Sequence, residues 1–206
     1  MIVTPVDHGF EDVLGVSTSP RSPGLHMSEI YGDLYQDMEP TRYVRGAPMD
    51  PLRLEAGLIF EQMLEEGLKR RLQASGGGRP GEFIESEHGI IYSPDLILFN
   101  GETRLGEIKL TWLSNSEMPR EVANNLPQKF DKYLTQMKAY CRCLETPYAR
   151  LMALFVNGGY EFLRKNKAER KPPAPAFGAW DLTFTKRELD ENWSTLINHA
   201  KFKGML

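Results

Sequence analysis

The sequence has 206 residues, of which 41% are hydrophobic, 26% charged and 10% aromatic, and its formal net charge is −3. This composition predicts a folded domain with a sizeable core. The net charge excludes a protein whose whole surface is basic and binds nucleic acid, but it allows a local basic strip. No stretch approaches the roughly 18 apolar residues of a membrane span. Because residues 1–10 lack a basic segment followed by an apolar one, we expect a cytoplasmic protein with no membrane partner.

The N-terminal part predicts an arm followed by a short helix. Residues 1–24 are rich in Gly, Pro, Ser and Thr and favour an extended or flexible arm, which leaves residues 25–206 as a single domain. Apolar residues then recur until Pro40 ends the segment, and Ser28 is a candidate N-cap. Leucines at helical spacing next predict a long helix over residues 51–74.

After that helix the apolar residues no longer recur at helical spacing but at every second position, as in strands. Residues 82–92, 95–100 and 103–112 therefore predict a three-stranded antiparallel meander, with turns at Ser93-Pro94 and Asn100-Gly101.

The rest of the chain predicts a helix over residues 127–145, strands over 149–157 and 179–185, and a C-terminal helix over 186–202 whose core side includes Trp193. The order of elements predicts an α/β fold in which a central mixed sheet is flanked by helices.

Three charged residues lie on the otherwise apolar strands of the meander. Glu107 and Lys109 are two positions apart on one strand, so their side chains point to the same face of the sheet, and Ile108 points to the opposite face. The turn between the strands brings Asp95 back beside Glu107 and Lys109. A solvated strand face with a cross-strand ion pair is the alternative. The apolar strands and the rigid Pro94 favour a site.

Two carboxylates held together repel each other unless a cation lies between them. Mg²⁺ suits Asp95 and Glu107, because it prefers hard oxygen ligands, and the carbonyl of Ile108 is a further candidate ligand. Lys109 can stabilise phosphate charge or help the attacking water. Cys141 and Cys143 lie two apart, which suits neither a disulfide nor a zinc site, so we expect free thiols.

The motifs S-P-D, ending at Asp95, and G-E-I-K, ending at Lys109, resemble those of the PD-(D/E)xK nuclease superfamily, whose core has the same order of elements. Gln136 and Tyr140 resemble the Q-x3-Y motif of RecB-like nucleases, in which this pair holds the DNA end and the active-site network. Four residues apart, they share one helix face. The alternative for this pair is an ordinary amphipathic helix.

On the first long helix, Gly57 and Glu61 resemble the G-x3-(E/H) motif of lambda-type phage exonucleases, whose acidic or histidine residue reaches the metal. We expect Gly57 to allow a close approach of the helix to the sheet. Relatives with an iron–sulfur cluster need four cysteines, so the resemblance implies a member without a cluster.

The resemblance implies a Mg²⁺-dependent deoxyribonuclease, with Mn²⁺ able to substitute. It favours an exonuclease of phage-type recombination or DNA processing, acting in the host cytoplasm if it is phage-encoded. A structure- or sequence-selective endonuclease and a non-catalytic DNA-binding protein are the alternatives. A single-strand annealing protein as partner and a homotrimer around DNA are expected from the resemblance alone.

Two groups of basic residues are candidates for contacts with the DNA backbone. Lys129, Lys132 and Lys138 lie on the second long helix. The other group follows the strand 149–157 and is equally compatible with a solvated loop; it consists of Arg164, Lys165, Lys167, Arg170 and Lys171.

Overall fold

The protein is described by a computed structural model that covers most of the chain. The residues expected to form the arm, as far as residue 20, and the basic group at 164–171 lie outside the described residues. The described residues are 21–45, 51–72, 81–99, 101–114, 126, 128–157 and 176–206.

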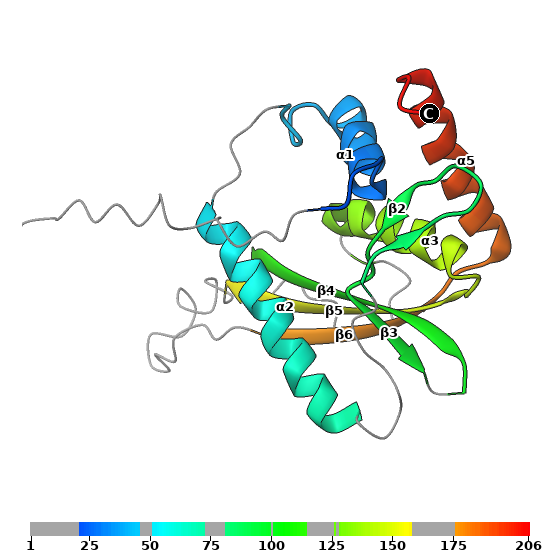
Figure 1. The fold of residues 1–206 in the computed structure, drawn as a ribbon. Helices are drawn as coiled ribbons and strands as arrows, with labels where there is room; N and C mark the ends of the chain where they lie inside the picture. The colour runs from blue at the N-terminus through cyan, green and yellow to red at the C-terminus, as the bar shows by residue number, and fades with distance from the viewer. Residues whose placement is uncertain are drawn as a thin grey trace, which may run out of the picture.

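A mixed four-stranded sheet forms the centre of the fold (Figure 1), and its strands are β3 (Leu96–Phe99), β4 (Thr103–Ser114), β5 (Tyr148–Asn157) and β6 (Ala176–Thr183). The spatial order is β3-β4-β5-β6. Strands β3 and β4 pair antiparallel, β4 and β5 parallel, and β5 and β6 antiparallel. The prediction of a mixed sheet is confirmed.

Helices cover both faces of this sheet (Figure 1). Helix α2 (Pro51–Leu72) crosses one face, and α1 (Met27–Met38), α3 (Asp131–Cys143) and α5 (Lys186–Phe202) cover the other. A short 3-10 turn, η3 (Gln128–Phe130), leads into α3. Among the described residues, no helix combines the length and apolar character needed to cross a membrane.

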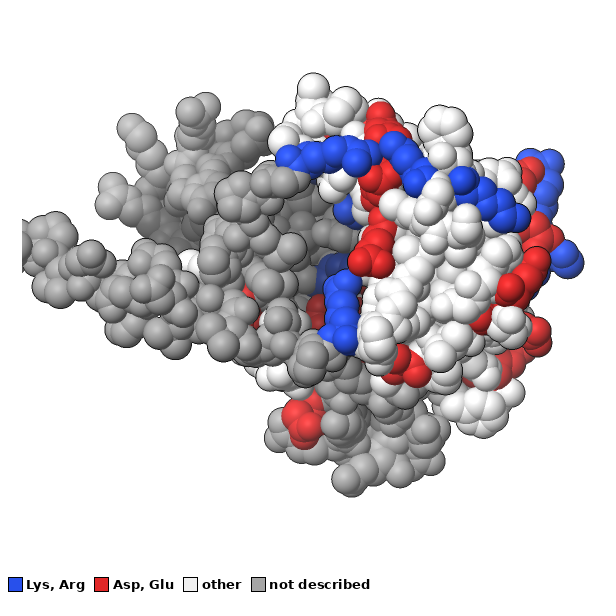
Figure 2. All heavy atoms as spheres, turned by 45° about the horizontal axis from the view of Figure 1, so that its top comes forward, with Lys and Arg blue, Asp and Glu red and all other residues white. Residues whose placement is uncertain are grey.

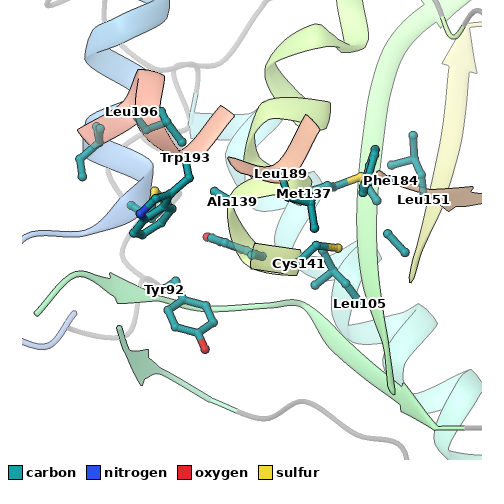
Figure 3. Close-up of a cluster of buried hydrophobic side chains, with 14 of the residues drawn as sticks. Tyr92, Leu105, Met137, Ala139, Cys141, Leu151, Phe184, Leu189, Trp193 and Leu196 are labelled. Carbon is teal, nitrogen blue, oxygen red and sulfur yellow. The ribbon is translucent and has the colours of Figure 1, made fainter. Parts of the chain in front are cut away.

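Side chains that alternate along β4 contribute to two separate cores. Leu105 belongs to the larger core under α1, α3 and α5, together with Met137 and Trp193 (Figure 3). Ile108 belongs to the smaller core, where it packs with Phe60 of α2. The predicted opposition of Ile108 and Glu107 is thus confirmed, and Glu107 points into the layer of α1 and α3.

The segment 82–92 does not form the first strand of a meander, so this prediction was wrong. It folds into a hairpin of its own, with β1 (Phe83–Ile84) paired to β2 (Ile91–Tyr92) in a separate sheet. The Glu85 carboxylate accepts 2.8 Å hydrogen bonds from two backbone N–H groups of the turn, and Gly89 supplies a φ of +70°. Residues 93–94 consequently connect two sheets instead of two paired strands.

Two local expectations were also wrong. The N-cap of α1 is His26, whose N–H donates to Glu29 (2.9 Å), whereas the Ser28 hydroxyl accepts a hydrogen bond from Arg21 (3.1 Å). Gly57 is not required for a close approach, because a Cβ added there would meet no described atom within 4 Å.

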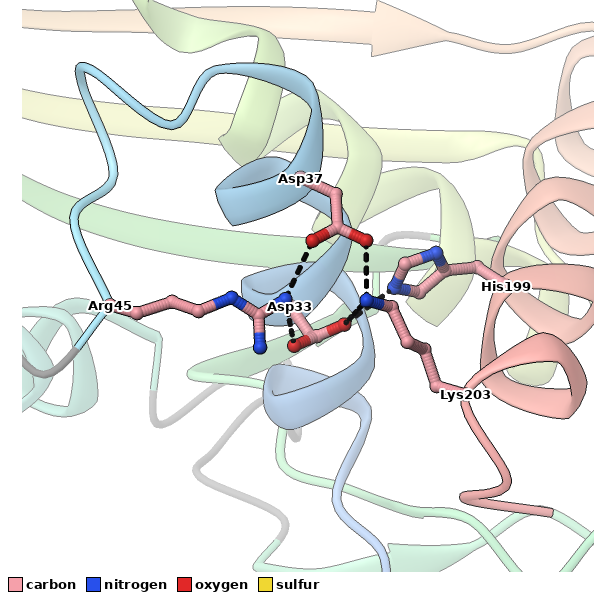
Figure 4. A network of polar contacts seen from close by, with 5 residues as sticks. All are labelled: Asp33, Asp37, Arg45, His199 and Lys203. Carbon is pink, nitrogen blue, oxygen red and sulfur yellow. Dashed lines mark hydrogen bonds and ion pairs between the residues drawn. The ribbon is translucent and has the colours of Figure 1, made fainter.

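A network of charged side chains joins α1 to α5 (Figure 4). Arg45 Nη2 lies 2.6 Å from Asp37 and 2.8 Å from Asp33; Lys203 Nζ lies 2.6 Å from Asp37, and His199 Nε2 lies 2.8 Å from Asp33. Hydrogen bonds from Lys203 and Arg45 lower the pKa of Asp37. The negative charge here is well compensated, so the network holds the two helices together.

Candidate active site

Strands β3 and β4 bring the three predicted residues together. Because Leu96 pairs with Gly106 in the antiparallel ladder, Asp95 comes beside Glu107. The N–H of Ile108 donates to Asp95 Oδ2 (2.8 Å), which aims that carboxylate. Lys109 Nζ lies 3.7 Å from Asp95 Oδ2 and forms an ion pair with Glu107 Oε1.

Gly106 allows the two strands to approach closely at this point. A Cβ on Gly106 would lie 2.8 Å from the Cβ of Leu96, closer than real Cβ contacts allow. The glycine of the G-E-I-K motif therefore sets the spacing between β3 and β4, and with it the separation of the two carboxylates.

Negative charge exceeds positive charge in this cluster. Glu107 is fully buried, and among the described residues neither of its carboxylate oxygens has a hydrogen-bond partner beyond the ion pair with Lys109. Burial and the neighbouring Asp95 raise the pKa of Glu107 to about 8. Burial alone would lower the pKa of Lys109, but Glu107 and Asp95 raise it well above its usual value, so Lys109 stays charged.

Glu61 adds a third carboxylate from α2. Its side chain is partly buried, and its charge contributes to the raised pKa of Glu107, after the larger effects of burial and Asp95. The predicted carboxylate of the first long helix is therefore within electrostatic reach of the cluster.

Helix α3 presents the predicted Gln136 and Tyr140, and both side chains are buried. Burial raises the pKa of Tyr140 well above its usual value, and Tyr31, Glu107 and Asp95 add to this effect. The ring of Tyr140 also packs against Tyr92, 5.6 Å between centroids. Tyr140 thus packs in the hydrophobic core and also interacts electrostatically with the charged cluster.

Two tyrosines at this cluster were not predicted from the sequence. Tyr31 of α1 interacts electrostatically with Lys109, Glu107 and Asp95, and burial is the main cause that raises its pKa to about 12. Tyr133 of α3 holds its ring centroid 5.5 Å from Lys109 Nζ. The only sequence signal for Tyr31 is the helical pattern around it, which predicts the helix but not its neighbours.

The three predicted lysines of the second long helix have different surroundings. Lys132 lies beside Tyr31, with 5.7 Å from Nζ to the ring centroid, whereas Lys138 lies 5.7 Å from the ring of Phe184. Lys129 is exposed. Figure 2 shows described Lys and Arg side chains that run as a band across the upper part of this face, with Asp and Glu side chains beside them.

The donor set of the cluster fits a hard divalent cation. Asp95 and Glu107 offer carboxylate oxygens of the kind that Mg²⁺ and Mn²⁺ prefer, and buried Glu107 has only the ion pair with Lys109 as a partner among the described residues. Two groups among the described residues bring ligand atoms of three side chains within 4.8 Å of one another, and the set of Asp95, Glu107 and Glu61 is not one of them; the two groups are Asp33, Asp37 and His199, and Glu85, Glu87 and His88. In the first group Arg45 and Lys203 compensate the carboxylates, and in the second Glu85 accepts backbone N–H groups.

No protein-family model matches the sequence, and a search of curated proteins finds no significant match. Solved structures do share its fold. An alkaline exonuclease from Laribacter hongkongensis is similar with a TM-score of 0.51 and 13% identity, covering 87% of this chain and 89% of that one. A phage-related exonuclease from Haemophilus somnus 129PT has a TM-score of 0.50 and 10% identity, covering 84% and 78%.

At these identities the similarity shows the fold. The protein has the α/β fold of these exonucleases, which confirms the fold predicted from its motifs.

Proposed function

We propose that this protein is a metal-dependent nuclease that hydrolyses DNA phosphodiester bonds. The observation that carries the proposal is the convergence of Asp95, Glu107 and Lys109, with negative charge in excess, in a fold shared with exonucleases. Two carboxylates that share one ammonium leave uncompensated negative charge in a buried place, which is costly and favours a further cation as partner.

Asp95, Glu107, Glu61 and the carbonyl of Ile108 are the residues that we assign to the metal, which is Mg²⁺, with Mn²⁺ able to substitute. When bound, the metal supplies Lewis-acid polarisation of the phosphate. Asp95 is already aimed by the N–H of Ile108. Lys109, charged and held between two carboxylates, orients the attacking water and stabilises the charge that develops on the phosphate.

We assign substrate positioning to Gln136 and Tyr140 and backbone contacts to Lys129, Lys132 and Lys138, together with the basic residues of 164–171. The proposed mode is an exonuclease that leaves 5′-phosphates in phage-type recombination or DNA processing. A single-strand annealing partner, a homotrimer and the host cytoplasm as the location belong to the same proposal. The similarity to two exonucleases supports this mode over an endonuclease.

The test incubates linear and covalently closed circular duplex DNA with Mg²⁺ or Mn²⁺, using wild type and Lys109→Ala. We expect degradation of linear DNA only, and its loss in Lys109→Ala. Nicking of the circle would instead identify an endonuclease. Absence of cleavage with either metal, while the wild type still binds DNA, contradicts the proposal.

A further inference from the structure

Lys132, in the first turn of α3, lies between two tyrosine rings. Its Nζ is 5.7 Å from the ring centroid of Tyr31 in α1 and 4.7 Å from that of Tyr43, which follows α1. Burial lowers the pKa of Lys132. Within the part of the chain that the structure describes, no carboxylate forms an ion pair with it.

This environment is unusual for a lysine. A partly desolvated ammonium loses water, and the faces of tyrosine rings replace only part of that interaction. Lys203, by comparison, contacts Asp37 at 2.6 Å. Among the described residues Lys132 contacts two ring faces and no carboxylate, so an anionic ligand would complete its surroundings.

The position of Lys132 indicates which anion this is. Tyr31, one of its two rings, interacts electrostatically with Lys109, Glu107 and Asp95. Tyr31 therefore lies beside Lys132 and within electrostatic reach of the proposed catalytic cluster. A substrate strand whose scissile phosphate lies at that cluster carries further phosphates along its backbone.

The ring of Tyr43 also contacts Arg42. The guanidinium of Arg42 lies 5.1 Å from the ring centroid of Tyr43, and it donates hydrogen bonds to Glu39 (3.1 Å) and to the carbonyl of Lys129 (3.1 Å). Arg42 thus ties the turn after α1 to the start of α3, and it keeps Tyr43 over the lysine.

We propose that Lys132, held between Tyr31 and Tyr43, binds a backbone phosphate of the substrate strand that flanks the scissile bond. The strand then follows the seam between α1 and α3 into the catalytic cluster. Because Lys132 would contact the charge of a phosphate and not the edge of a base, this contact does not depend on the DNA sequence. The inference rests on the proposed nuclease function, since it names the residue that holds the strand of that substrate.

The experiment measures the salt dependence of binding to fluorescein-labelled single-stranded and duplex oligonucleotides in EDTA, where no cleavage occurs. For Lys132→Met we expect several-fold weaker binding and a slope of log affinity against log salt that is smaller by about 0.7 for single strands and about 0.9 for duplex, the loss of one phosphate contact. Lys132→Arg restores the slope. Lys201→Met, an exposed lysine of α5, is the matched control and keeps the wild-type slope.

A wild-type slope in Lys132→Met, or a slope lost equally in Lys201→Met, overturns the inference. Thermal unfolding verifies that each variant is folded, and Lys132→Gln with the same expected slope replaces Lys132→Met if the latter does not fold. The nuclease proposal fails differently, by absence of cleavage in Mg²⁺ or Mn²⁺ while the slope difference at Lys132 persists.

Discussion

Two acidic clusters in this protein differ in how their charge is compensated. At the seam of α1 and α5, the carboxylates of Asp33 and Asp37 contact three basic side chains, and the pKa of Asp37 is lowered. At the β3–β4 strand pair, Lys109 is the only described basic residue that pairs with Asp95 and Glu107, and the pKa of Glu107 is raised to about 8.

This difference in charge compensation distinguishes a structural network from a candidate metal-binding site. Ion pairs that are complete within the chain leave no negative charge for a ligand, whereas a buried carboxylate in excess favours an added cation. Both clusters bring acidic side chains close together, so proximity alone does not distinguish them. The two clusters are distinguished by the number of basic partners of their carboxylates and by the direction in which the carboxylate pKa is shifted.

The largest expected difference between the clusters is in catalysis. Glu107→Gln and Asp95→Asn each remove a group that we assign to the metal, and we expect DNA cleavage to fall by roughly 10²- to 10³-fold. Asp37→Asn, the matched variant in the network, keeps the wild-type cleavage rate. A time course with end-labelled linear DNA measures all three, and equal losses in Asp37→Asn and Glu107→Gln would remove the distinction.

The next largest effect is on stability at the site. In Lys109→Met the carboxylates lose the cation that pairs with both of them. Because Lys109 lowers the pKa of Glu107, the pKa of Glu107 in the variant rises above 8. The folded state then retains a proton that the unfolded state releases near 4.5, so the free energy of unfolding falls as the pH rises through this range. We expect a loss of about 3–5 kcal/mol relative to wild type at pH 9 and a smaller loss at pH 5.

Urea unfolding at the two pH values, with and without Mg²⁺, measures this prediction. Mg²⁺ is expected to stabilise Lys109→Met more than wild type, because it supplies the missing positive charge. A loss of stability that is the same at both pH values and insensitive to Mg²⁺ contradicts it.

The network is expected to contribute to stability only. Asp33→Asn removes the partner of Arg45 and His199, and Asp33 is largely buried, so we expect a loss of about 1–3 kcal/mol in the free energy of unfolding. Cleavage by the folded variant stays at the wild-type rate. Calorimetry and the cleavage assay on the same preparation check both statements, and a folded but inactive variant would link the network to catalysis.

The smallest effect is expected at an exposed carboxylate. Asp181 of β6 accepts two hydrogen bonds from Arg150 (2.7 and 2.9 Å), and these lower its pKa, but half of its side chain is exposed. We expect Asp181→Asn to cost less than about 1 kcal/mol near neutral pH, because solvent screens the pair. Since the pKa is lowered, this contribution disappears as the pH falls through that lowered value, so wild type and variant converge in acid urea melts.

The local part of the site could be predicted from the sequence. Glu107 and Lys109 share a face because strand side chains alternate, and a short turn returns β4 along β3, so Asp95 must meet them. The helical spacing of Gln136 and Tyr140 follows from the same kind of local rule.

The remaining features depend on tertiary packing. Tyr31 reaches the cluster only because α1 packs on α3, and no local pattern encodes which helices pack together. The hairpin at 82–92 was mispredicted as one strand, although its apolar residues lie only at the two ends of the segment and residues 85–89 between them are polar or glycine. The turn depends on the side chain of Glu85 and on the positive φ of Gly89.

The central claim is that the undercompensated cluster, and not the network, holds a divalent metal. Calorimetric titration of the folded protein with Mn²⁺ tests it directly, using wild type, Glu107→Gln and Asp33→Asn. We expect wild type and Asp33→Asn to bind Mn²⁺ and Glu107→Gln to lose this binding. Binding that survives in Glu107→Gln and disappears in Asp33→Asn would contradict it.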